Sequence, residues 1–143
     1  MEKSQQAIVL TRTYDAPISK VWKALTEIEQ MRQWYFPMLA DFKPEIGFTT
    51  EFEAGPEGKP YLHRWIVTEV IENKKIAYKW LYPAIEGDST LSFEIESVER
   101  GTKLTLTHSG LESFQANGDP NFEPGSFNGG WTHFIQAFAD YIE

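Results

Sequence analysis

The sequence contains no cysteine among its 143 residues, which excludes disulfides, thiol nucleophiles and thiolate metal ligands. Basic residues are also scarce, with 13 Lys and Arg against 21 Asp and Glu, for a formal net charge of -8. A phosphate backbone or an anionic membrane would repel such a chain, so we expect no nucleic-acid partner. No apolar run is long enough to span a bilayer, and no signal core follows the N-terminus. The sequence therefore predicts no membrane insertion and a cytoplasmic location.

Residues that carry chemistry are equally sparse. The three histidines, His63, His108 and His133, fall on separate predicted elements, so we expect no metal site. Ser109 lacks the context of a nucleophile elbow, and no dinucleotide-binding motif occurs, so we expect no cofactor. With no catalytic motif, the sequence favours a non-enzymatic role, and an enzyme stays open as an alternative.

Apolar and aromatic residues are abundant, at 41% and 15% of the chain, enough for one well-buried core. We therefore predict a single domain over residues 1–143. The segment 130–142 has the periodicity of an amphipathic helix whose bulky face would cover a sheet. That face comprises Trp131, Phe134, Ile135, Phe138, Tyr141 and Ile142.

The rest of the chain alternates between strand-like and helix-like patterns. Predicted strands cover residues 7–14, 48–53, 61–72, 75–82, 91–96 and 102–108, and shorter helices cover 18–25 and 27–34. A capping box, Thr26 with Glu29, predicts the start of the second helix. The inward face of 61–72 stays undecided, because Trp65 with Val67 competes with Ile66 and Val70. The order predicts an α+β fold: one strand, two short helices, an antiparallel meander and a long helix.

Several segments together resemble the bacterial relatives of the heat-shock protein 90 ATPase activator. They are Tyr14-Asp15-Ala16-Pro17, Val21 to Thr26, Trp34, Leu104 to Gly110 and Gly130-Trp131. The resemblance implies a START-like (SRPBCC) helix-grip fold, in which a curved antiparallel sheet wraps around the C-terminal helix and encloses a hydrophobic cavity. One departure is Trp65, which stands where we expect glycine in many relatives. Its bulk would narrow that cavity.

The predicted ligand-binding residues are those that the helix-grip fold would turn toward this cavity. The aromatic candidates are Trp34, Phe48, Phe52, Tyr78, Trp80, Phe93, Trp131, Phe134 and Phe138. Arg12, His108 and Tyr78 are the polar candidates that would orient the ligand. Arg12, on a first strand next to the last, would approach His108 or receive an anionic ligand head. Each also has a plainer interpretation: the rings form an ordinary core, His108 bonds to the backbone, and Arg12 points outward.

Three functional hypotheses follow. The leading one is a non-enzymatic binder of a small hydrophobic or amphipathic ligand. The second is a co-chaperone-like module that modulates a heat-shock protein 90 ATPase, which makes a chaperone a candidate partner. The third is a cyclase- or hydrolase-type enzyme that uses His108 together with a tyrosine.

Overall fold

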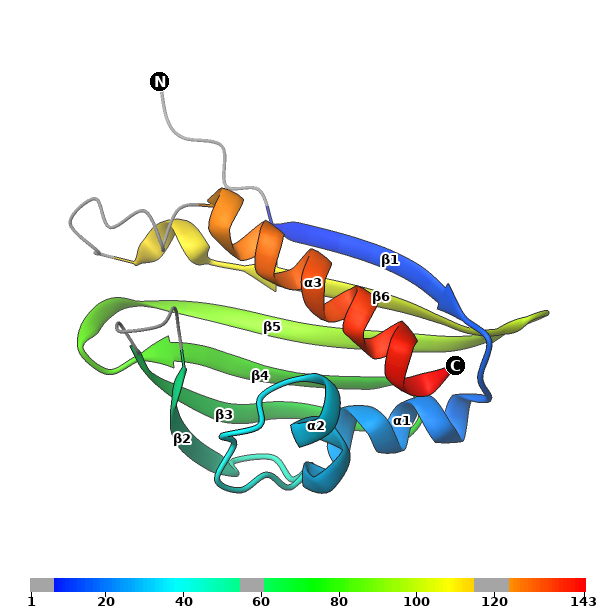
Figure 1. Cartoon of the computed structure of the whole chain (residues 1–143). Coiled ribbons are helices and arrows are strands. Elements are labelled where there is room, and N and C mark those ends of the chain that lie inside the picture. Colours follow the sequence, from blue (N-terminus) through cyan, green and yellow to red (C-terminus); the bar gives the residue numbers. More distant parts are fainter. Residues whose placement is uncertain (1–6, 55–60, 115–123) are drawn as a thin grey trace.

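A curved antiparallel sheet dominates the computed structural model, which describes residues 7–54, 61–114 and 124–143 (Figure 1). Its six strands lie in the order β1-β6-β5-β4-β3-β2. They are β1 Ile8–Tyr14, β2 Thr49–Ala54, β3 Tyr61–Ile71, β4 Lys75–Tyr82, β5 Ile85–Val98 and β6 Gly101–Ser109. β1 pairs with the last strand, β6, and forms one edge of the sheet, whereas β2 forms the other.

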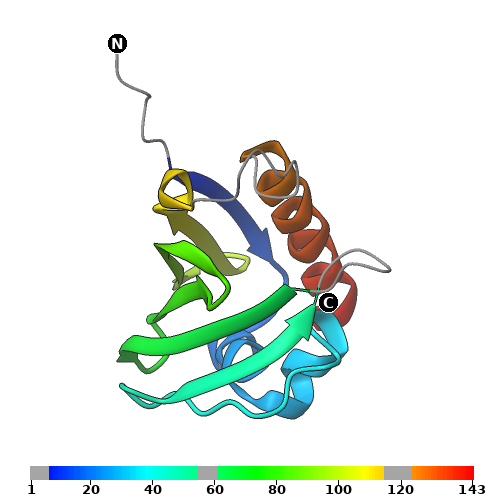
Figure 2. The ribbon, with the colours of Figure 1, turned by 90° about the vertical axis from the view of Figure 1, so that its left-hand side faces the viewer.

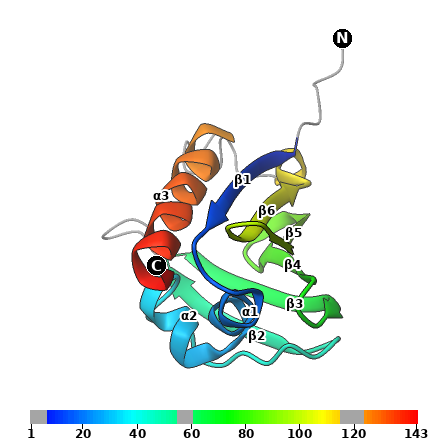
Figure 3. The same ribbon diagram turned by 90° about the vertical axis from the view of Figure 1, so that its right-hand side faces the viewer.

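The helices lie on the concave side of this sheet. They are α1 Ile18–Thr26, α2 Ile28–Trp34, the short 3-10 helix η1 Leu111–Ser113 and α3 Pro124–Ile142. Helix α3 crosses the concave face, and the sheet curves around it when the molecule is viewed from either end (Figures 2 and 3). α1 and α2 lie at the end of the sheet near the C-terminus of α3 (Figure 1). This is the helix-grip α+β architecture that the sequence predicts.

Strand alternation positions the core. On β4, Ile76, Tyr78 and Trp80 are buried on the concave side, whereas Lys75, before them, and Lys79, between Tyr78 and Trp80, are partly exposed. A strand whose side chains are alternately buried and exposed has one covered face, and here α3 and the α1–α2 pair cover it. The core therefore lies between the concave sheet face and the helices.

A β-bulge explains why the inward face of β3 could not be chosen from the sequence. Trp65 and Val67 are buried inward, opposite Trp80 and Tyr78. The register then shifts between Val67 and Glu69, so that Val70 also packs against the core. Because the extra residue reverses the alternation, parts of both competing patterns are correct.

Three local predictions were wrong. The Thr26 hydroxyl donates to the Trp22 carbonyl at 2.8 Å inside α1, so no capping box forms. β5 starts at Ile85 instead of residue 91, because its polar first half still has a backbone partner in β4. α3 starts at Pro124 instead of residue 130, with Gly129 and Gly130 inside it. Packing of the helix on the sheet offsets the low helix propensity of glycine.

Candidate functional site

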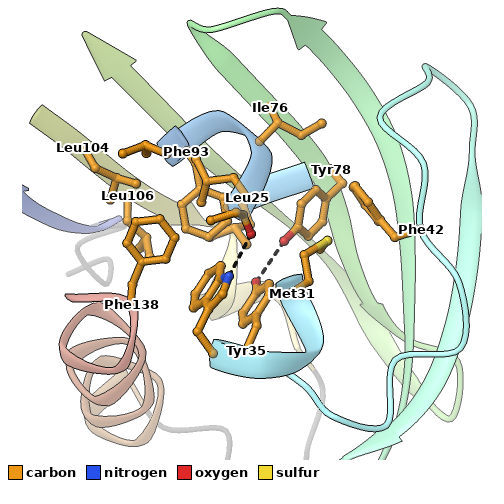
Figure 4. Close-up of a cluster of buried hydrophobic side chains, with 14 of the residues drawn as sticks. Leu25, Met31, Tyr35, Phe42, Ile76, Tyr78, Phe93, Leu104, Leu106 and Phe138 are labelled. Carbon is orange, nitrogen blue, oxygen red and sulfur yellow. Dashed lines mark hydrogen bonds between the residues drawn. The ribbon is translucent and has the colours of Figure 1, made fainter. Parts of the chain in front are cut away.

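The interior between sheet and α3 brings most of the predicted ligand-binding residues together. The candidates found there are Trp34 from α2, Tyr78 and Trp80 from β4, Phe93 from β5, His108 from β6, and Trp131, Phe134 and Phe138 from α3. Their rings interlock edge to face: the centroids of Trp34 and Phe138 lie 4.7 Å apart, and those of Trp80 and Trp131 lie 5.3 Å apart. Tyr78, Phe93 and Phe138 face this common interior in Figure 4.

His108 is held by a chain of hydrogen bonds that uses both of its ring nitrogens. The indole Nε1–H of Trp131 donates to His108 Nδ1 at 3.0 Å, so the imidazole proton must sit on Nε2. That nitrogen lies 2.9 Å from Ser89 Oγ, whose own proton is donated to the Trp80 carbonyl at 2.6 Å. The chain fixes the neutral tautomer and leaves the imidazole no free nitrogen in this conformation.

Burial governs the protonation of the two interior histidines. Desolvation lowers the pKa of His108 to about 3. Desolvation also lowers the pKa of His63 to about 4, opposed in part by the hydrogen bond between His63 Nδ1 and the Tyr61 carbonyl. Both imidazoles are therefore neutral at physiological pH, and neither carries the positive charge that would attract an anionic headgroup.

A pair of tyrosines forms a second polar feature in this interior. The hydroxyl oxygens of Tyr35 and Tyr78 lie 2.9 Å apart (Figure 4). Burial raises the pKa of each phenol well above its ordinary value. Tyr35, just after α2, was not predicted as a site residue. The aromatic run Trp34-Tyr35-Phe36 was the available signal, but the side that each ring would face depended on the path of the following loop.

Phe52 and Phe48 extend the ring cluster toward β2. Phe52 is buried, stacks on His63 at 5.0 Å and meets Trp65 edge to face at 4.8 Å. Phe48 is half-buried and contacts Phe42 at 6.2 Å, on the periphery of the cluster. His63 and Trp65 were not predicted as site residues, because their inward orientation depends on the side chosen for β3.

Arg12 does not join the other candidates. It pairs with Leu104, whereas His108 pairs with Ile8, four residues away along the same strand. This offset corresponds to roughly 13 Å, so the suggested approach of Arg12 to His108 was wrong. The Arg12 guanidinium donates instead to the side-chain oxygen of Gln136 at 3.0 Å and lies over the Tyr14 ring.

A gap between α3 and the sheet is narrow where the described residues line it. The gap is lined by Tyr14, Leu25, Trp34, Phe93, Leu104, Leu106, Phe134, Ile135 and Phe138. It has no room for a water molecule. In the part of the chain that the structure describes, this gap cannot receive a ligand unless side chains or helices move.

The described residues contain no cluster of three or more His, Asp or Glu side chains placed to hold a metal ion. Among the helices of these residues, none combines the length and apolarity needed to cross a bilayer. A cytoplasmic location stays a prediction from the sequence.

The curved sheet wrapped around α3 defines a protein of the START-like helix-grip class. The chain belongs to the family described as activator of Hsp90 ATPase homolog 1-like protein, whose model matches residues 15–143. The resemblance stated from the sequence is thereby confirmed. No curated protein matches the sequence.

Solved structures share this fold over almost the whole chain. A protein of Rhizobium loti matches with a TM-score of 0.80 and 18% identity, covering 96% of this chain and 97% of its own. A protein of Chromobacterium violaceum matches with a TM-score of 0.78 and 17% identity, over 96% and 97%. The Aha1 dimer of Colwellia psychrerythraea matches with a TM-score of 0.73 and 21% identity, over 96% of both chains. At these identities, the comparisons show the fold alone.

Proposed function

We propose that the protein binds a small hydrophobic or amphipathic ligand between the sheet and α3, without catalysis. The observation that carries the proposal is the placement of hydrogen-bonding groups deep inside an aromatic interior: His108 with Ser89, and Tyr35 with Tyr78. A core needed only for stability is built more simply from apolar side chains, because every buried polar group must find a partner. Rings for burial combined with a few polar groups for orientation are typical of ligand sites.

Because the gap beneath α3 has no room for a water molecule, entry of a ligand there requires movement of a covering side chain or helix. The N-terminal half of α3 is the element best suited to move, since Gly129 and Gly130 are exposed and each lowers helix stability by about 1 kcal/mol relative to alanine. Phe134, one turn further along, is only half-buried and is the first bulky ring that such a movement would release. Burying apolar ligand surface contributes about 25 cal/mol per Å2. This gain must exceed the free energy that the opening costs.

The test is an amide and indole NMR titration of the labelled protein with fatty acids, sterol-like compounds and aromatic compounds. We expect shifts that cluster at Trp80, His108 and Trp131, because these residues join the sheet to α3 through one hydrogen-bonded chain. Shifts confined to exposed residues such as His133 would indicate surface adsorption. A spectrum unchanged by the whole panel would contradict the proposal.

A co-chaperone role is the second candidate, favoured by the family match together with the narrow gap beneath α3. In this case the interior is a packed core, and the acidic surface, with a net charge of -8, would contact a heat-shock protein 90. We expect the protein to change the ATPase rate of a chaperone from the same organism, with an effect that weakens as salt is raised. An unchanged rate across a concentration series would remove this candidate. An enzyme using His108 is not proposed, because both imidazole nitrogens are engaged.

A further inference from the structure

Trp65 occupies the centre of the aromatic cluster, and its indole N–H has no acceptor. The side chain is 0% exposed, and Nε1 is the one buried side-chain nitrogen or oxygen without a hydrogen-bond partner among the described residues. The indoles of three other buried tryptophans are satisfied: Trp34 donates to the Ala24 carbonyl, Trp80 to the Tyr82 hydroxyl and Trp131 to His108. An unsatisfied buried donor costs about 1–3 kcal/mol, so its presence calls for an explanation.

The neighbouring tyrosines do not accept from this indole. Trp65 stacks on Tyr35 with centroids 5.4 Å apart and lies 4.6 Å from Tyr78, yet the two phenols bond to each other. One phenol donates to the other, so the second phenol keeps a proton for which the described residues offer no acceptor. The cluster around Trp65 thus holds two unused donors. Two unused donors suit a ligand group that only accepts hydrogen bonds.

Phe36 packs against Trp65 and is itself partly exposed. Its ring is only half-buried, although it contacts Phe52 at 5.0 Å, Trp65 at 5.8 Å, Trp80 at 6.0 Å and Phe134 at 5.0 Å. The residue follows α2 in a segment without regular secondary structure, so fewer backbone hydrogen bonds hold it than hold a strand residue. Rotation of this one side chain would vacate the place of its phenyl ring. A flat ligand of similar size would then contact the same aromatic side chains.

We propose that the Trp65 indole N–H recognises an acceptor oxygen on a flat, largely apolar ligand whose ring takes the place of Phe36. This inference rests on the proposed ligand-binding function and narrows the ligand class to compounds such as aryl ketones, in which a carbonyl adjoins an aromatic ring. A hydrocarbon of the same shape would fill the space but leave the indole unpaired. Selectivity for an acceptor then follows from the unused donor.

The experiment compares acetophenone with α-methylstyrene, in which a methylene group replaces the carbonyl oxygen. Both are titrated into the wild-type protein and into Phe36→Ala, which removes the covering ring, and indole N–H resonances are followed by NMR. Loss of one resonance in Trp65→Phe assigns the Trp65 signal. We expect acetophenone to bind about tenfold more tightly than α-methylstyrene, with a downfield shift of the Trp65 indole proton.

Two variants complete the design. Trp65→Phe should bind both probes equally, whereas Trp22→Phe should keep the preference, because Trp22 has no ring contact with this cluster among the described residues. If Phe36→Ala does not fold, Phe36→Leu replaces it. Equal binding of the probes, or a ketone preference that survives in Trp65→Phe, overturns the inference and leaves ligand binding intact. Binding of neither probe to either form overturns both the inference and the proposed function for this ligand class.

Discussion

Lowering the pH from 7 to 5 is expected to reduce the free energy of unfolding by about 4 kcal/mol, or about 2 kcal/mol for each interior histidine. The native pKa values are about 3 for His108 and about 4 for His63, against 6.5 for an ordinary histidine. Below pH 6.5 the unfolded chain takes up protons on both imidazoles, while the native state does not until far lower pH. Their contribution is therefore complete above pH 6.5 and is lost as the pH falls toward the native values.

Urea unfolding at a series of pH values between 7 and 5 measures this effect. Carboxylates titrate mainly below this range, so the histidines dominate the change within it. His63→Phe should halve the loss, since phenylalanine keeps the stacking on Phe52 without a titrating group. His133→Gln, on the exposed face of α3, should leave the loss unchanged. A wild-type stability that does not vary over this range would show that the two imidazoles are not buried as described.

Replacing Gly101 with alanine is expected to destabilise the protein by about 3 kcal/mol or more. Gly101 begins β6 with φ +142°, a region that disfavours any residue with a Cβ. An added Cβ would lie 2.1 Å from the Tyr14 carbonyl oxygen, so β1 would have to move away. That movement would also strain the neighbouring bond from the Thr102 hydroxyl to the Ala16 carbonyl, 2.8 Å long and buried.

Gly130→Ala is the matched control for this substitution. Gly130 is exposed within α3, and nothing lies within 4 Å of the position that its Cβ would take. Alanine there should stabilise the helix by about 1 kcal/mol. Urea midpoints of the two variants should therefore move in opposite directions from the wild type. If Gly101→Ala unfolds at the wild-type midpoint, the close approach of β1 and β6 at this turn is wrong.

The inward orientation of side chains was predicted best where a simple helical or strand period decides which way each side chain faces. Tyr78 and Trp80 face inward because they lie two residues apart on β4, and Trp131 and Phe138 do so because they share a helical face. Prediction was poorer where the backbone departs from a period. The β3 bulge hid the inward position of Trp65, and the irregular segment after α2 hid the roles of Tyr35 and Phe36.

Arg12 illustrates a different limit. Strand alternation places Arg12 on one face of β1 with Ile8 and Tyr14, yet its distance from His108 depends on how far β1 is shifted along β6. Only the pairing of Ile8 with His108 sets that distance. Alternation specifies the face of a residue but carries no information on its position along a neighbouring strand.

The sequence by itself determined the element order, the α+β class and the acidic character of the chain, because these follow from local periodicity and from counting charges. The helix-grip fold was implied by the resemblance to a known family. Tertiary structure decided which polar groups meet. The chain from Trp131 through His108 and Ser89 to the Trp80 carbonyl joins α3 to three strands. It also decided that the gap beneath α3 has no room for a water molecule and that the Trp65 indole has no acceptor among the described residues. Such outcomes depend on distances between segments far apart in the chain, which only three-dimensional packing sets.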